Sequence, residues 1–320
     1  MFKFIERVIV RVPHRISGFF EIVDSNNGKV ITDPLKIGSR GAGFNVNAFG
    51  KTIITYKKNE GNDKSECLIF INNQEMNQKA ETTYYIFNSV KSYIKNNVKV
   101  KIEHFFDLPV GCGYGASGSG ALGTIFGLNT LFNLNLTSFE CGKIAHVSEV
   151  VNKTGLGTVC GQLGGGLCIL KEPGYPCRTE RLNVPNNIII ICASLGKIQT
   201  KAILSDPELS TNIKEAGKIA LNNINLNPNY KNFVKYSIDF VKKSNILKKL
   251  NLYEIKELMD ELNSLKIIGA SMNQLGESVY IFCKKNKINI VNDVLNKYSE
   301  NFKRFILRIY NNKSILIEKS

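Results

Sequence analysis

Several residue types and patterns that mark other classes of protein are scarce in this sequence. The 320 residues contain no tryptophan and only three histidines, and the eight cysteines form no C-x-x-C pair. A structural zinc site is therefore not expected, and we interpret the cysteines as reduced, mostly buried thiols. No apolar run approaches the roughly 20 residues that span a bilayer, and segment 1–12 lacks a signal-peptide cleavage site. We expect a cytoplasmic protein with no membrane partner.

Acidic residues are also few compared with basic ones. The chain has 42 Lys and Arg against 27 Asp and Glu, which gives a formal net charge of +15. The lysines are spread as short doublets, and no aromatic RNA-binding signature lies among them. We therefore interpret the charge as a solvated surface or as steering of anionic substrates, and we expect no nucleic-acid partner.

What the chain does contain is typical of a globular protein with a sizeable core. Hydrophobic residues make up 43% of the sequence and charged residues 22%. The length allows one large domain or two ordinary ones. Segment 172–181, which contains Pro173 and Pro176, resembles a connection between domains. It divides the chain into predicted domains 1–180 and 181–320.

The most informative stretch is 98–132, which predicts a strand, a glycine-rich loop and a helix. Glycines occur at positions 111, 113, 115, 118, 120 and 123. Glycines let backbone N–H groups approach a ligand closely, and a helix start adds positive potential, so the stretch predicts a phosphate site. It lacks the Gly-Lys-Ser/Thr ending of a Walker A loop. A dinucleotide fold needs a following strand, whereas this helix is followed by another helix.

Two further glycine-bearing segments precede residue 170. Segment 38–43 (GSRGAG) is predicted to be a loop carrying a single arginine, and segment 154–158 (TGLGT) forms another predicted loop. Three such loops in the first half of the chain suggest that they converge on one ligand.

Particular segments resemble a known family. Segment 109–117 (PVGCGYGAS) is similar to the second motif of the GHMP kinases, and 269–272 (GASM) to the third. Within that family, the chain resembles the archaeal pantoate kinases at segments 16–20 (ISGFF), 38–43, 154–157, 200–201, 204–207 and 270–276.

The resemblance implies both a fold and an activity. The implied fold is α+β with two domains, a ribosomal S5 domain 2-like N-terminal domain and a ferredoxin-like C-terminal domain. The implied activity is that of a phosphotransferase with an alcohol group as acceptor. It would use ATP and Mg²⁺ to phosphorylate the primary hydroxyl of pantoate to 4-phosphopantoate in archaeal coenzyme A biosynthesis. A homodimer is also consistent with the family.

The resemblance also assigns residues to the nucleotide and the metal. Ser117 and Glu149 are the implied Mg²⁺ ligands, and both are predicted to act in catalysis together with Thr158. Some GHMP kinases have an aspartate base near the position of Thr158, so this threonine either orients the substrate hydroxyl or simply turns the loop. The predicted ATP-binding residues are Pro109, Gly111, Gly113, Gly115, Ala116, Ser117, Gly118 and Ser119.

Because pantoate is a carboxylate, its site should contain a cation. Arg40, isolated among glycines, is the natural bidentate partner. The predicted substrate-binding residues are His14, Arg15, Ser17, Arg40 and Lys201.

Three alternatives remain open at this point. The acceptor could be another hydroxy acid or alcohol, such as a homoserine-like molecule. The departure at Thr158 would also suit a pseudo-kinase that binds ATP without transfer, and the net charge of +15 would suit an RNA-binding non-enzyme.

Overall fold

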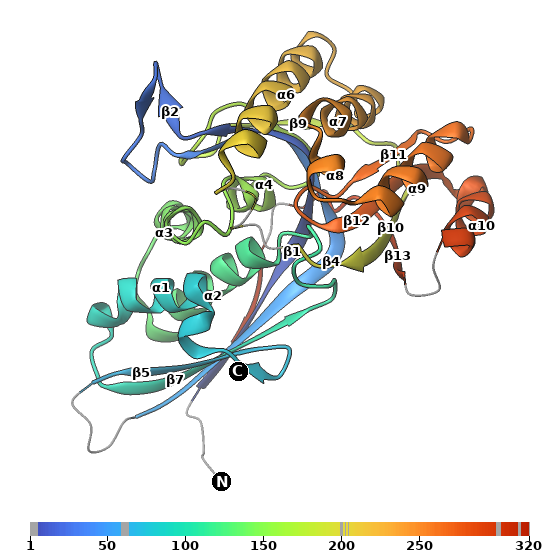
Figure 1. Ribbon diagram of the computed structural model, residues 1–320. Helices are drawn as coiled ribbons and strands as arrows, with labels where there is room; N and C mark the ends of the chain where they lie inside the picture. The colour runs from blue at the N-terminus through green and yellow to red at the C-terminus, as the bar shows by residue number, and fades with distance from the viewer. Residues whose placement is uncertain are drawn as a thin grey trace.

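The computed structural model describes residues 6–58, 64–198, 201, 203, 205–298, 302–312 and 315–319. Two sheets, each covered by helices, make up the molecule (Figure 1). The first is an eight-stranded sheet whose main path has the order β14-β1-β4-β7-β5-β6, while β8 joins β4 and β9 joins β8. Its strands are β1 (Glu6–Val23), β4 (Gly38–Lys58), β5 (Glu66–Ile71), β6 (Gln74–Glu75), β7 (Val98–Phe106), β8 (Leu167–Leu170), β9 (Thr179–Leu182) and β14 (Leu316–Lys319).

Helices of the first half of the chain cover one face of this sheet, and the predicted glycine loop lies just before one of them, α2. Helix α2 contacts β1 and β4, and it also packs against its helical neighbours. The predicted strand, loop and helix appear as β7, an irregular segment and α2. The helices and turns are α1 (Glu81–Val90), α2 (Ala116–Phe132), α3 (Ser138–Val151), α4 (Thr158–Gly164), η1 (Asn77–Lys79) and η2 (Lys91–Tyr93), and β2 (Ser25–Asn26) pairs with β3 (Lys29–Val30) in a separate hairpin.

The second sheet has four antiparallel strands in the order β11-β12-β10-β13. None of the described helices is long and apolar enough to cross a membrane. The strands are β10 (Ile188–Gly196), β11 (Gly269–Met272), β12 (Glu277–Lys284) and β13 (Lys303–Leu307), and the helical elements are α6 (Pro207–Leu226), α7 (Tyr230–Ser244), α8 (Ile246–Lys249), α9 (Tyr253–Ser264), η3 (Lys285–Lys287) and α10 (Ile288–Tyr298).

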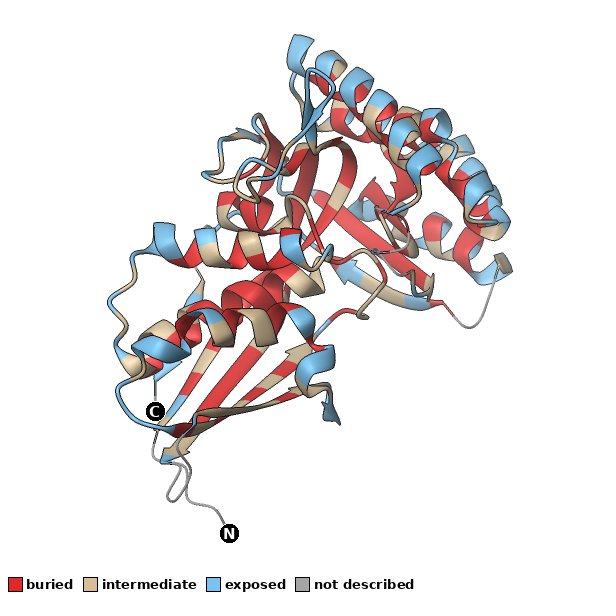
Figure 2. Ribbon diagram, turned by 60° about the vertical axis from the view of Figure 1, so that its left-hand side comes forward, coloured by how far each residue is buried: buried red, intermediate tan, exposed pale blue. Residues whose placement is uncertain are grey.

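Strands β1 and β4 connect the two halves of the molecule, as their length in Figure 1 shows. They contain 18 and 21 residues. Helix α6 packs against both strands, and α7 packs against β1. Phe44 of β4 contacts Tyr280 and Phe282 of the second sheet edge to face, with ring centroids 5.2 and 5.1 Å apart. Buried residues accordingly form a continuous layer from one half to the other (Figure 2).

The structure corrects the predicted loop at 38–43, which is part of β4. Gly41 pairs with Phe20, and Gly43 pairs with Ser17. A Cβ atom at position 41 would lie 2.3 Å from the carbonyl oxygen of Phe19, so these glycines allow two strands to approach closely. Strand β1 continues past Pro13 through two irregularities in register, between Pro13 and Arg15 and between Ser17 and Phe19.

Two further features depend on contacts that are distant in sequence. Strand β14, which the predicted division places in the second domain, pairs with β1 of the first sheet. Cys160 and Cys177 form a disulfide, so the expectation of reduced thiols is wrong for these two. The chain after β8 folds back onto α4 and brings their Cα atoms to 5.2 Å, which sequence spacing could not reveal. The other six cysteines are free.

Candidate active site

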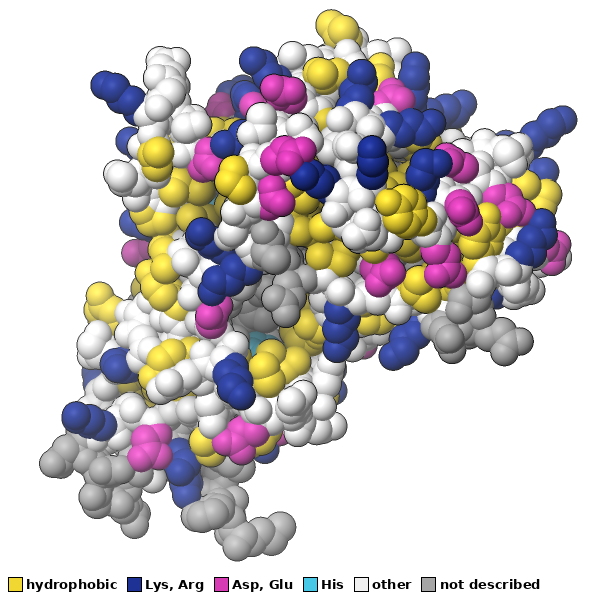
Figure 3. All heavy atoms as spheres, viewed as in Figure 1, with side chains coloured by type: hydrophobic (Ala, Val, Ile, Leu, Met, Phe, Trp, Pro, Cys, Tyr) yellow, Lys and Arg dark blue, Asp and Glu magenta, His cyan; other side chains and the backbone are white. Residues whose placement is uncertain are grey.

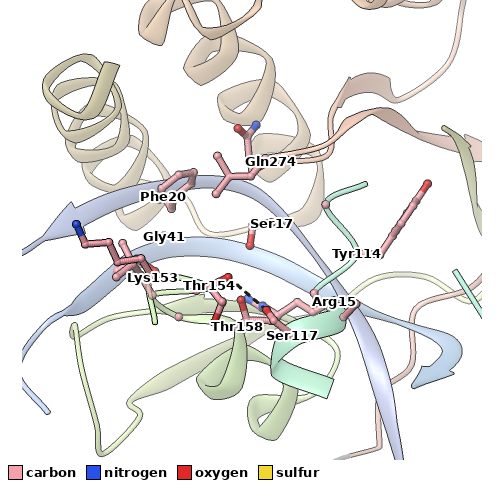
Figure 4. A pocket seen from close by; sticks show the side chains of 18 of the residues that line it. Arg15, Ser17, Phe20, Gly41, Tyr114, Ser117, Lys153, Thr154, Thr158 and Gln274 are labelled. Atoms are coloured by element: carbon pink, nitrogen blue, oxygen red, sulfur yellow. Dashed lines mark hydrogen bonds between the residues drawn. The ribbon is translucent and has the colours of Figure 1, made fainter. Parts of the chain in front are cut away.

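A cleft of about 400 Å³ lies where the two halves meet. Its walls come from β1 and β4, the loop before α2, the loop between α3 and α4, and the turn after β11 (Figure 4). All three glycine-bearing segments identified in the sequence contribute to this cleft, although one of them is a strand.

The loop before α2 owes its shape to glycines in left-handed backbone conformations. Gly111, Gly113 and Gly115 have φ angles of +84°, +79° and +66°, which other residues rarely adopt. The N-cap of α2 is Gly115, and no side chain caps the first turn. The backbone N–H groups at this helix start are therefore available to an anion, which the positive end of the helix dipole also favours.

The loop is held in place from behind by buried polar groups. Ser278 donates a hydrogen bond to the carbonyl oxygen of Cys112 at 2.6 Å, and the Arg15 amide donates to that of Tyr114 at 3.1 Å. The His14 Nδ1 atom lies 2.9 Å from the same Tyr114 oxygen. Burial lowers the pKa of His14 to about 4, so this ring is neutral near pH 7.

Ser117 and Glu149 form the central polar pair of the site. The Ser117 hydroxyl donates to Glu149 Oε1 at 2.6 Å. Glu149 is only 1% exposed, and burial raises the pKa of its carboxyl to about 7, against the opposing effects of Ser117 and the Val159 amide. A Cβ atom at Gly155 would lie 2.5 Å from the carboxylate, so glycine is needed to make room for it.

This pair fits the chemistry of Mg²⁺ bound together with a nucleotide. A hard cation takes oxygen ligands, and Mg²⁺ is commonly held by one or two protein groups plus phosphate oxygens. Glu149 has no cationic partner among the described residues, and Ser117, which is bonded to it, lines the cleft together with the glycine loop (Figure 4).

Not every predicted site residue lines the cleft. Ser119 is fully buried and accepts a hydrogen bond from Gln162 Nε2 at 2.8 Å. Those that line it are Arg15, Ser17, Arg40, Gly111, Gly113, Gly115, Ala116, Ser117, Thr158 and Lys201, whereas His14, Pro109, Gly118, Ser119 and Glu149 lie behind its surface.

The predicted cations differ in what they contact. Arg40 binds Glu21 through two nitrogens, with Nη2 2.8 Å and Nε 3.1 Å from the same Oε2 atom. Lys201 forms an exposed ion pair of 3.3 Å with Glu81.

The guanidinium of Arg15 is buried behind the cleft. Its Nη1 donates to Asn45 Oδ1 at 3.4 Å, with Cys168 Sγ at 3.5 Å. It lies against α4, since a Cβ atom at Gly161 would be 1.8 Å from its Nε.

Thr158 begins α4 and packs against the glycine loop. A Cβ atom at position 115 or 118 would lie 2.8 Å from its Cγ2, so those glycines allow the threonine to sit beside the start of α2.

Lys153 and Gln274 are among the residues of the cleft that sequence reasoning missed. Lys153 has a φ of +53°, a conformation that costs of order 1 kcal/mol for a non-glycine residue. Gln274 joins the turn after β11 to β1, because its amide donates to Ser17 O at 3.2 Å and its Nε2 donates to Gly18 O at 3.0 Å. The sequence offered one signal for Lys153, since it is a basic residue directly before the segment TGLG. It offered no signal for Gln274.

Charged side chains are dispersed on the face shown in Figure 3. Lys and Arg are interspersed with Asp and Glu over both halves and form no single basic stripe on this face.

Comparison with known proteins gives the family. The model of the GHMP kinases N terminal domain matches residues 81–166. A pantoate kinase from Methanocaldococcus jannaschii is 32% identical over 278 residues, which cover 86% of this chain and 93% of that protein. The chain belongs to the pantoate kinase family of GHMP kinases. A second member of the pantoate kinase family, from Methanospirillum hungatei, is 28% identical over 297 residues, 93% of each protein.

Solved structures agree with this membership. A phosphotransferase related to the CoA biosynthesis pathway superposes with a TM-score of 0.82 at 26% identity, over 98% of both chains. A homoserine kinase from Cytophaga hutchinsonii gives a TM-score of 0.68 at 13% identity over 100% of this chain and 99% of that one, which reflects the fold alone. The predicted α+β GHMP kinase fold is thus confirmed.

Proposed function

We propose that this chain is an ATP-dependent kinase that phosphorylates the primary hydroxyl of pantoate to give 4-phosphopantoate. The observation that carries the proposal is the glycine loop before α2, which opens onto a cleft and ends at Ser117, bonded to the buried Glu149. The identity of 32% to a pantoate kinase over 86% of the chain supports the choice of acceptor.

Phosphoryl transfer depends on alignment and charge stabilisation more than on covalent chemistry. Backbone N–H groups of residues 111–117 donate hydrogen bonds to the ATP phosphates, and the α2 dipole favours their negative charge. Ser117 and Glu149 would hold Mg²⁺, which neutralises charge on the phosphates.

Thr158 serves the acceptor side of the reaction in this proposal. It lines the cleft beside the start of α2, where its hydroxyl orients the primary alcohol toward the γ-phosphate. No carboxylate base is needed at this position, because a loose transition state forms little bond to the attacking oxygen, so the alcohol proton is lost late and can pass to a phosphate oxygen or to solvent.

The proposal also includes the setting of the enzyme. We place it in the cytoplasm, where ATP and Mg²⁺ are available, with a small-molecule substrate and no nucleic-acid partner. The net charge of +15 then steers anionic substrates toward the cleft. A homodimer is the proposed assembly, and light scattering coupled to gel filtration tests it.

A coupled assay of ADP release with pantoate, together with detection of 4-phosphopantoate by mass spectrometry, tests the function. We expect turnover with pantoate and at least tenfold weaker turnover with homoserine or mevalonate. Glu149→Gln should lower kcat about 1,000-fold, since several kcal/mol of charge stabilisation would be lost. Glu172→Gln is the control because this glutamate pairs with Arg178 on the surface. Absence of ATP consumption with pantoate would refute the proposal.

A further inference from the structure

We propose that Lys153 binds the carboxylate of the acceptor and thereby sets the preference for a hydroxy acid over a neutral alcohol. This inference rests on the proposed function and deepens it by naming a residue outside the sequence-predicted site. It starts from the four basic residues that line the cleft, which are Arg15, Arg40, Lys153 and Lys201.

Two of these cations pair with carboxylates, and a third is buried. Arg40 donates to Glu21 through both its Nε and its Nη2. Lys201 pairs with Glu81 at 3.3 Å. Arg15 is only 2% exposed, and its guanidinium contacts Asn45 and Cys168.

Lys153 is the cation of the cleft that is exposed and has no ion-pair partner among the residues that the structure describes. It is exposed, it lines the cleft, and its left-handed backbone conformation with φ of +53° sets the direction of its side chain. Hydrogen bonds on both sides fix that conformation, because the Lys153 amide donates to Val150 O at 3.2 Å and the Thr154 amide to Glu149 O at 3.0 Å. A strained residue presented to a cleft is typical of a functional position.

The location of the ammonium group favours a carboxylate over the nucleotide phosphates. In Figure 4 the Lys153 side chain extends along the wall beside Gly41, and its nitrogen lies at the end of the view away from Tyr114. The phosphate loop is at the Tyr114 end, and Ser117 and Thr158 lie between the two. An acceptor with its alcohol near Thr158 would therefore direct its other end toward Lys153.

Apolar residues of the cleft fit the middle of the pantoate molecule. Pantoate carries two methyl groups on the carbon between its primary alcohol and its hydroxy acid. Phe20, Ala42, Leu156 and Leu170 provide apolar surface in the same cleft as Thr158 and Lys153. A branched hydroxy acid thus finds an alcohol site, apolar surface and a cation within one cleft.

The test compares Lys153→Met with two matched variants. Loss of one charge-assisted hydrogen bond should raise the KM for pantoate about 10- to 100-fold and leave the KM for ATP within about twofold. Lys143→Met removes a lysine from the exposed face of α3 outside the cleft and should leave the KM for pantoate unchanged. Lys153→Arg should recover part of the loss.

A neutral substrate separates carboxylate binding from a general effect on the cleft. The wild type should prefer pantoate over pantoamide, whereas Lys153→Met should use the two with similar KM. An unchanged KM for pantoate in Lys153→Met, an equal effect in Lys143→Met, or a rise in the KM for ATP would each overturn the inference. Wild-type turnover with pantoate decides the proposed function separately, so the two can fail independently.

Discussion

Segments 38–43 and 111–115 each contain three glycines, and the structure uses them for different physical reasons. In β4, Gly41 and Gly43 lie against the backbone of β1, where a Cβ atom would come within 2.3 and 2.4 Å of carbonyl oxygens. In the loop before α2, the glycines have φ angles between +66° and +84°. The first set serves close packing of two strands, where Gly41 also has a φ of +149°, and the second serves the backbone shape of a loop.

This difference determines which segment can bind an anion. The backbone groups of residues 38–43 pair with β1, and those of residues 41–43 also pair with β8 on the other side. Their amides are therefore taken up by strand pairing. The loop before α2 has no such ladder, and its helix start has no side-chain cap. Glycine content alone therefore does not identify a phosphate site, because what counts is whether the amides remain free.

The largest expected effect tests whether the loop meets the phosphates. Ser117→Ala should lower kcat/KM about 100-fold, as removal of one preorganised polar group from a charged transition state does. Ser119→Ala, two residues later, should leave kcat/KM within about threefold and lower the free energy of unfolding by about 1 kcal/mol, since its hydroxyl bonds only Gln162 and Pro13. Steady-state kinetics and urea titrations measure both. Equal kinetic losses in the two variants would contradict this assignment.

The next effect separates the two glycine segments directly. Gly113→Ala places a methyl group in a left-handed position, 2.9 Å from the Cβ of Asn273, and should weaken nucleotide binding about tenfold with a small loss of thermal stability. Gly41→Ala should instead lower the melting temperature, because the methyl would press on the β1 backbone. Calorimetric nucleotide titration and thermal denaturation give the two readouts. If Gly41→Ala impaired nucleotide affinity more than stability, the comparison would fail.

The smallest expected effect is a pH dependence of stability caused by two buried histidines. Burial lowers the pKa of His14, under the loop, and of His104, in β7, to about 4 each. Both rings stay neutral when folded and are protonated below about pH 6.5 when unfolded. The contribution of these histidines to the free energy of unfolding is therefore fully present above pH 6.5 and is lost as the pH falls toward 4. Between pH 7 and 5.5 the loss is about 1 kcal/mol per histidine.

Urea unfolding at several pH values measures this loss, and His104→Gln should reduce its slope. A wild-type unfolding free energy that stays constant from pH 7 to 5.5 would show that these histidines are not buried as neutral rings.

Local sequence patterns predicted the elements whose signals are contained within them. The predicted change from strand to glycines to helix was found at β7 and α2. The loop predicted at 38–43 was wrong, because its glycines allow β4 to approach β1 closely.

Only part of the candidate site could be predicted from the sequence. Motif resemblance pointed to Ser117 and Glu149, which the structure brings within a hydrogen bond of 2.6 Å. It also pointed to Arg40 as a free cation, whereas Glu21 on the adjacent strand binds it. Pairing between β1 and β4 places Glu21 opposite Arg40, and no pattern within either segment reveals that register.

The sequence by itself determined the family, the fold class and the glycine loop before α2, because these depend on local glycine geometry and on motifs that lie close together along the chain. Tertiary structure alone decided which cation remains free, which serine faces the cleft and which cysteines join. Each of these depends on the neighbours that a side chain meets across strands and helices, and packing and strand register set those neighbours. The hydrogen bond from Ser278 to the carbonyl oxygen of Cys112, for example, joins residues more than a hundred positions apart in the sequence.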